Sequence, residues 1–142
     1  MKIRSLFLLS AGFVAGIAAT SASASLLQRA PIPDAPIASP DHYKVEFENE
    51  FVRVIRVTFG PHAKMVMHQH PDPGGVIVTV TDQDALITAP DGTSREVHYK
   101  AGQFRWAAST PGADLSSQSA HREENLSDKP FEMIRIEAKR AR

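Results

Sequence analysis

From Tyr43 onward, short runs of alternating apolar and polar residues dominate the chain. β-branched and aromatic residues fill these runs, and turn-forming residues separate them at intervals of roughly 8 to 12 residues. Alternation with a period of two predicts strands, because successive side chains on a strand point to opposite faces of the sheet. No stretch sustains a helical period. The pattern therefore predicts one all-β domain, either a sandwich, a jelly roll or a barrel.

The turn residues divide this domain into strands whose approximate limits can be stated. A tight turn at Asn49-Glu50 and a hairpin turn at Asp91-Gly92 are the clearest separators. A long polar loop, 109–120, can be a functional lid or a disordered segment. The predicted strands are 43–49, 51–59, 64–70, 76–82, 84–90, 93–100, 102–108 and 131–139, with a further short segment at 121–125.

The ends of the chain differ in composition from this domain, which we place at residues 42–139. Residues 1–24 have the basic start, apolar centre and small-residue cleavage site of a bacterial-type signal peptide, and the apolar run is shorter than the roughly 20 residues of a membrane span. We therefore expect an exported protein, periplasmic or secreted. Residues 25–41 carry four prolines between Ala30 and Pro40 and form a linker or an arm on the domain. Residues 140–142 form a short basic tail.

The charge balance and the absence of cysteine exclude several classes of function. The chain has 16 basic and 16 acidic residues, and removal of the signal peptide takes away Lys2 and Arg4 but no acid. Such a balanced charge does not indicate nucleic acid or a membrane surface as a partner. Without cysteine there are no disulfides, no thiolate chemistry and no cysteine-based zinc sites. Stability must come from packing, to which a metal ion or a dimer can add.

The stretch MVMHQHPDPGG, residues 65–75, contains two histidines that can share one ligand. His68 and His70 are two residues apart, so on a strand both imidazoles point to the same face. The segment HREEN repeats this geometry and places His121, Glu123 and Asn125 on one face. If the two segments are neighbours, three imidazoles meet, which favours one divalent metal ion. The alternative is a cluster of core histidines that hydrogen-bond to one another.

The two histidine segments and their flanking glycines resemble the motifs of the cupins, which are double-stranded β-helix or jelly-roll barrels. The first cupin motif has a glycine, H-x-H and then a glutamate; the second has a glycine, a proline-containing turn and H-x-x-x-N. The matching residues here are Gly60, His68 and His70 for the first motif, and Gly102, Pro111, His121 and Asn125 for the second. The resemblance extends over residues 43–139. It implies a single metal site held by His68, His70 and His121.

The glutamate of the first motif is missing, because its expected position falls at Gly74 or Gly75. Three replacements are open. Water can occupy the position, Glu123 can supply an oxygen from the face of His121, or Asp72 can reach in from the loop. We expect water as the direct ligand, with Glu123 nearby or acting as a general base. The metal can be zinc, iron, manganese or nickel.

A small-molecule substrate or ligand is the expected partner of such a site. Gln103 and Arg105 share one face of the strand after Gly102, and Trp106 lies on the other; either face can line the cavity. We expect a metalloenzyme with dioxygenase chemistry, or with lyase or isomerase chemistry in which Glu123 moves a proton. The alternative is a non-catalytic, metal-stabilised module that binds a small ligand or a protein. The resemblance to cupins also implies a homodimer.

Overall fold

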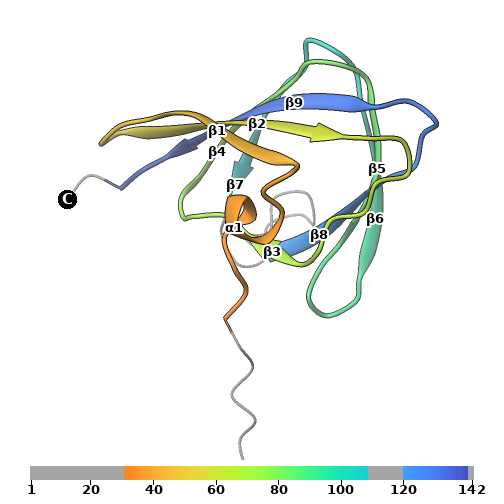
Figure 1. The fold of residues 1–142 in the computed structure, drawn as a ribbon, viewed down its shortest axis with the longest axis horizontal. Helices are drawn as coiled ribbons and strands as arrows, with labels where there is room; N and C mark the ends of the chain where they lie inside the picture. The colour runs from red at the N-terminus through yellow and green to blue at the C-terminus, as the bar shows by residue number, and fades with distance from the viewer. Residues whose placement is uncertain (1–30, 109–119, 141–142) are drawn as a thin grey trace, which may run out of the picture.

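The structure is a computed structural model that describes residues 31–108 and 120–140, and these residues form two antiparallel sheets (Figure 1). The five-stranded sheet has the order β1-β2-β9-β4-β7, with β1 (Tyr43–Glu48), β2 (Val52–Phe59), β9 (Phe131–Ala138), β4 (Gly74–Thr79) and β7 (Phe104–Ala108). The four-stranded sheet has the order β3-β8-β5-β6, with β3 (His68–Gln69), β8 (Ala120–Asn125), β5 (Gln83–Thr88) and β6 (Ser94–Tyr99). The predicted all-β jelly roll is confirmed. Across the described ranges, no helix has the length and hydropathy needed to cross a bilayer.

The strand predicted over 64–70 is much shorter than expected. Only His68 and Gln69 pair continuously with β8, and a single isolated bridge joins Lys64 to Glu124. Between these points the chain keeps contact with β8 through one hydrogen bond, from Met65 N to the carbonyl oxygen of Glu123 at 2.8 Å. The histidine segment is therefore anchored at both ends of a largely unpaired stretch.

The proline-rich segment lies on the domain where the structure describes it, from residue 31. It contains the single-turn helix α1 (Ala35–Ala38), and Ala35 is fully buried against the barrel. Gln69 N donates a hydrogen bond to the carbonyl oxygen of Pro33 at 2.8 Å, which ties the segment to β3. The expected signal peptide, residues 1–24, and residues 109–119 of the expected loop lie outside the described residues.

The barrel interior is apolar at one end and charged at the other. The inward residues of β2 and β9 pair across the sheet, from Phe59 with Phe131 at the apolar end to Arg53 with Glu137 at the charged end. The two phenylalanine rings stack with centroids 4.4 Å apart. Arg135, also on β9, is buried beside Glu137. The apolar core thus occupies one end of β2 and β9, and the polar region occupies the other end of the same strands.

The outer face of the five-stranded sheet is apolar where β9 crosses it. Strand register aligns Phe47, Val54, Ile136, Val76 and Trp106 in one row across all five strands. The ends of the row are open to solvent, with Phe47 52% and Trp106 53% exposed. From Ile134 to Glu137 the usual inward placement of apolar residues is therefore reversed. The isoleucines of this stretch point outward, and Arg135 and Glu137 point into the barrel.

Asn125, the last residue of β8, is fully buried and joins two loop segments. Its side-chain amide donates to the carbonyl oxygens of Gly60 and Lys129, both at 2.8 Å. Its Oδ1 accepts a hydrogen bond from Ser127 N at 3.0 Å. The second-motif asparagine is therefore a structural residue that holds the turns at the apolar end of the barrel.

We expect Asn125→Ala to lower the free energy of unfolding by about 2–4 kcal/mol, because a fully buried side chain and its three hydrogen bonds are lost. Urea denaturation measures this change. Asn49→Ala is the matched control, since the Asn49 side chain also accepts two backbone hydrogen bonds but in an exposed turn, where water can replace it at a cost of about 0.5–1 kcal/mol. Equal losses in the two variants would contradict the structural role of Asn125.

Candidate metal centre

Three histidines converge at the charged end of the barrel. β3 pairs with β8 so that His68 lies directly opposite His121, and His70 follows two residues later on the same face. The three side chains are 0%, 5% and 5% exposed for His68, His70 and His121. One ring nitrogen from each lies within 4.8 Å of the others. The structure thus brings together the three residues that the sequence pattern selects.

His68 is a neutral imidazole whose two nitrogens have defined roles. Its Nδ1 lies 2.9 Å from the carbonyl oxygen of Val66, and because a carbonyl only accepts, Nδ1 carries the proton. Burial lowers the pKa of His68 to about 4, which keeps the ring neutral near pH 7. Nε2 therefore has a lone pair, which accepts a hydrogen bond from the Tyr43 hydroxyl at 3.0 Å.

His70 has the same tautomer for a different reason. Its Nδ1 donates to Oε1 of Glu137 at 3.0 Å, so the lone pair is on Nε2. Burial lowers the pKa of His70 well below its usual value, and the nearby charge of Arg135 lowers it further. A carboxylate behind a histidine fixes the ring orientation and makes the facing nitrogen a better metal ligand.

The donor set fits a divalent transition-metal ion. Neutral imidazoles are the form that binds metal, and a set of three histidine nitrogens suits zinc, iron, manganese or nickel. The residues that would hold the ion are His68, His70 and His121. The three nitrogens do not by themselves distinguish among these metals.

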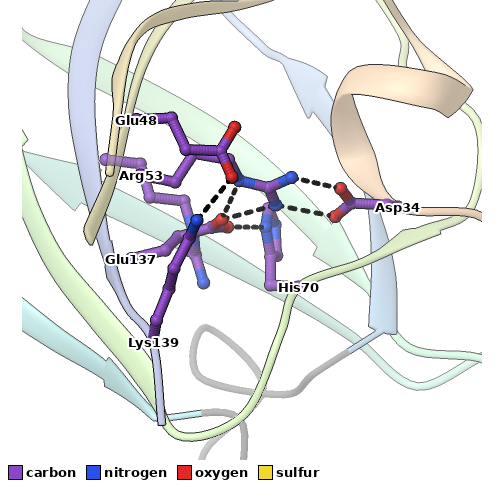
Figure 2. Close-up of polar contacts among 7 residues, drawn as sticks. Asp34, Glu48, Arg53, His70, Glu137 and Lys139 are labelled. Carbon is purple, nitrogen blue, oxygen red and sulfur yellow. Dashed lines mark hydrogen bonds and ion pairs between the residues drawn. The ribbon is translucent and has the colours of Figure 1, made fainter. Parts of the chain in front are cut away.

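Glu137 is the residue of this site that the sequence pattern did not reveal (Figure 2). It is fully buried, and its carboxylate accepts from His70 and Arg135 on Oε1 and from Arg53 Nε on Oε2, at 3.0, 3.0 and 2.7 Å. Period-two alternation places Glu137 on the same face of β9 as Phe131. Had that face been assigned to the interior, both Arg135 and Glu137 would have been recognised as buried charges.

Strand pairing explains why the motif glutamate cannot stand at Gly75. β4 pairs with β9 so that Gly75 lies opposite Glu137. A Cβ atom on Gly75 would overlap the carbonyl oxygen of Ile136 and come within 2.8 Å of the Glu137 Cα. No side chain fits there. The carboxylate beside the histidines comes instead from the neighbouring strand, and it contacts the far nitrogen of His70.

The two acidic residues considered as substitutes have different surroundings. Asp72 pairs with Arg140 and is partly exposed. Glu123 is buried, and its Oε1 accepts a hydrogen bond from Gln83 Nε2 at 2.7 Å. Burial raises the pKa of Glu123 to about 7, against the opposing effects of Arg105 and Gln83. Among the described residues, the cluster of potential ligand atoms contains three imidazoles and no carboxylate.

The three residues suggested for substrate binding lie in different places. Gln103 is exposed before β7 and accepts a hydrogen bond from Lys100 N at 2.8 Å. Trp106 lies on the outer face of the sheet. Arg105 contacts interior residues instead: its guanidinium lies 3.2 Å from Thr79 Oγ1 and 3.4 Å from Gln83 Oε1. Of the three, Arg105 is the one that belongs to the polar interior.

Two pockets reach residues of the polar interior from outside. One of about 320 Å³ lies beside His70 and Glu137, and Asp34, Arg53 and Gln69 contribute to its wall. The other, of about 510 Å³, is lined by Glu123 together with Met65, Met67 and Leu86. The wall of the second pocket also contains Lys64, Arg122 and Glu124, so it is partly apolar and partly charged.

Comparison with known proteins identifies the fold. No protein-family model and no curated protein matches the chain. A cupin domain from Bordetella pertussis Tohama I superposes with a TM-score of 0.59 at 24% identity, covering 78% of this chain and 98% of that one. A double-stranded β-helix protein from Klebsiella pneumoniae superposes with a TM-score of 0.50 at 22% identity, covering 68% and 74%. The protein therefore has the cupin fold, as its two histidine motifs predict.

We expect Tyr43→Phe to tighten Zn²⁺ binding by roughly fivefold, because the hydroxyl that occupies the His68 lone pair contributes about 1 kcal/mol that metal binding must replace. Competition with a chromophoric chelator measures this affinity. The same variant should be less stable than the wild type without metal, since a buried nitrogen loses its donor. Weaker Zn²⁺ binding would show that the hydroxyl supports the ion instead of competing with it.

Proposed function

We propose that the protein is a mononuclear metal-binding cupin that acts on a small organic molecule. The observation that carries this proposal is the convergence of three buried imidazoles, two of which have tautomers that present Nε2. One ring nitrogen from each histidine lies within 4.8 Å of the others, an arrangement that a shared divalent ion would suit. A bound divalent ion would supply Lewis acidity and open coordination positions.

Glu123 is the residue we propose for proton transfer. It follows His121 by two residues on β8, so its side chain shares the inward face of that histidine. Gln83 holds one of its oxygens, which fixes the orientation of the carboxylate. An acid that is held beside the imidazoles without joining them can give a proton to a substrate or take one from it.

The pocket at Glu123 supports a small organic substrate with an apolar part. Its volume of about 510 Å³ lies within the roughly 300–1,000 Å³ range of small-molecule sites. Its wall combines apolar residues such as Met65, Met67 and Leu86 with charged ones, and Glu123 is among the residues that line it. This combination favours lyase or isomerase chemistry, which depends on proton transfer, over dioxygenase chemistry.

Metal content tests the first part of the proposal. Protein purified from its native host should contain about one divalent ion per chain, and His70→Ala or His121→Ala should lower the affinity at least about 100-fold. Elemental analysis and chelator competition measure these quantities. His98→Ala is the control, because His98 is an exposed histidine that also contacts a carboxylate, that of Asp84. Wild-type protein without stoichiometric metal would overturn the proposal.

Glu123→Gln tests the second part. We expect metal content to stay within about twofold of the wild type while turnover falls by roughly 10²–10⁴. The assay is a screen of small carboxylic acids and diketones with metal-loaded protein, with oxygen consumption followed in parallel. Glu96→Gln is the control, since Glu96 is an exposed residue of β6 that does not line the pocket at Glu123. Lost metal would make Glu123 a ligand, and no turnover of any substrate by wild type would favour a binding module.

A further inference from the structure

Asp34 has an unusual role at the start of α1. Aspartate at the N-cap of a helix normally accepts hydrogen bonds from backbone amides of the first turn. Asp34 occupies the N-cap but makes no such bond. Both of its oxygens instead contact Arg53, at 2.5 Å to Nη1 and 3.0 Å to Nη2 (Figure 2). The Asp34 side chain therefore binds Arg53 of the barrel and does not cap its own helix.

The backbone around Asp34 is fixed to the strand that carries the histidines. Asp34 forms a parallel bridge with Gln69, the residue between His68 and His70. The hydrogen bond from Gln69 N to Pro33 strengthens this contact, and Ala35 is fully buried next to it. Residues 33–35 thus have one defined position relative to the metal centre.

Arg53 connects Asp34 to the buried carboxylate. Its Nε and Nη2 contact Oε2 of Glu137, at 2.7 and 2.5 Å, while Nη1 and Nη2 contact Asp34. Oε1 of Glu137 is left to accept from His70 Nδ1. The connection Asp34–Arg53–Glu137–His70 therefore runs without a gap from the N-terminal segment to a proposed metal ligand.

Arg53 lines the pocket of about 320 Å³, so a guanidinium bound to Glu137 alone has room to turn toward solvent. Asp34 is the second carboxylate that binds it. A bidentate arginine–carboxylate pair restricts the direction of the guanidinium as well as its distance. Loss of the pair would leave Glu137 with a less ordered partner on Oε2, and its other oxygen would hold His70 less firmly.

We propose that Asp34 is a positioning residue for His70, acting through Arg53 and Glu137 to hold the imidazole in its metal-binding tautomer and orientation. The N-terminal segment is in this view part of the metal centre, although it contributes no ligand. The effect on metal affinity rests on the proposed metal binding; the effect on the His70 tautomer does not.

Glu48 provides a matched control in the same pocket. It pairs with Lys139 at 2.7 Å, so it is also a carboxylate in an ion pair on the pocket wall. In Figure 2 the dashed line from Glu48 runs to Lys139, and no drawn interaction joins this ion pair to Arg53, Glu137 or His70. Glu48→Gln therefore removes a similar charge at a similar place without interrupting the connection to His70.

The experiment compares Zn²⁺ affinity in full-length mature protein for wild type, Asp34→Asn, Glu48→Gln, Glu137→Gln and the double variant that combines Asp34→Asn with Glu137→Gln. We expect Asp34→Asn to weaken binding by roughly three- to tenfold and Glu137→Gln by roughly 10–100-fold. The double variant should bind as Glu137→Gln does, because Asp34 acts through Glu137. Equal affinities for Asp34→Asn and Glu48→Gln would overturn the inference, and so would additive losses in the double variant.

A second readout needs no metal. In ¹⁵N NMR spectra of the metal-free protein, His70 should show the Nδ1-protonated tautomer in wild type and in Glu48→Gln. Asp34→Asn should show a mixture of tautomers or faster exchange of the Nδ1 proton. Unchanged His70 signals in Asp34→Asn would overturn the inference even if Zn²⁺ binds. Failure of wild type to bind Zn²⁺ would overturn the proposed function alone. Thermal melting of each variant confirms that it is folded.

Discussion

A fully buried carboxylate, that of Glu137, determines the arrangement of the polar end of this barrel. A charge removed from water is tolerated only when partners satisfy it, and Glu137 has two arginines and a histidine. These partners come from β2, from β9 itself and from the residue after β3. One carboxylate therefore links the five-stranded sheet to the histidine segment. Because loss of any partner leaves the buried carboxylate without a hydrogen bond or without a neutralising charge, the positions of the three partners are interdependent.

The fold tolerates this concentration of charge because the apolar packing that stabilises it lies at the other end of the barrel. β2 and β9 pair without interruption from Val52 to Phe59, and the stacked rings of Phe59 and Phe131 lie at the end away from Glu137. Asn125 holds the turns at that same end. In this chain without cysteine, one half of β2 and β9 thus contributes to a packed apolar core. The other half of the two strands carries the buried polar groups.

The strands and the histidine cluster were predictable because they depend on local rules. Alternation and turn residues located the strands, and the two-residue spacing put His68 beside His70 and aligned His121 with Glu123. The extent of pairing over 64–70 was not predictable, since it depends on the route of the chain along β8. Glu137 was missed for a related reason. Period two shows which residues of β9 share a face, but Phe131 and Met133 on one face and Ile134 and Ile136 on the other are equally apolar. Only the neighbouring strands decide which face is inside.

The same pairing gives the missing motif glutamate a physical explanation. With Gly75 packed against the backbone of β9, no carboxylate can stand at that position of β4, and the one that contacts His70 comes from β9. From there it contacts Nδ1 of His70 and not the side of the ring that faces His68 and His121. A carboxylate that binds a metal directly occupies a coordination position and reduces the charge of the ion. A carboxylate behind a histidine increases the basicity of that ligand and leaves the position open. A carboxylate on β9 in place of β4 therefore changes what the site could do: a bound metal ion would be held by three histidines, and a coordination position would stay open to water or to a substrate.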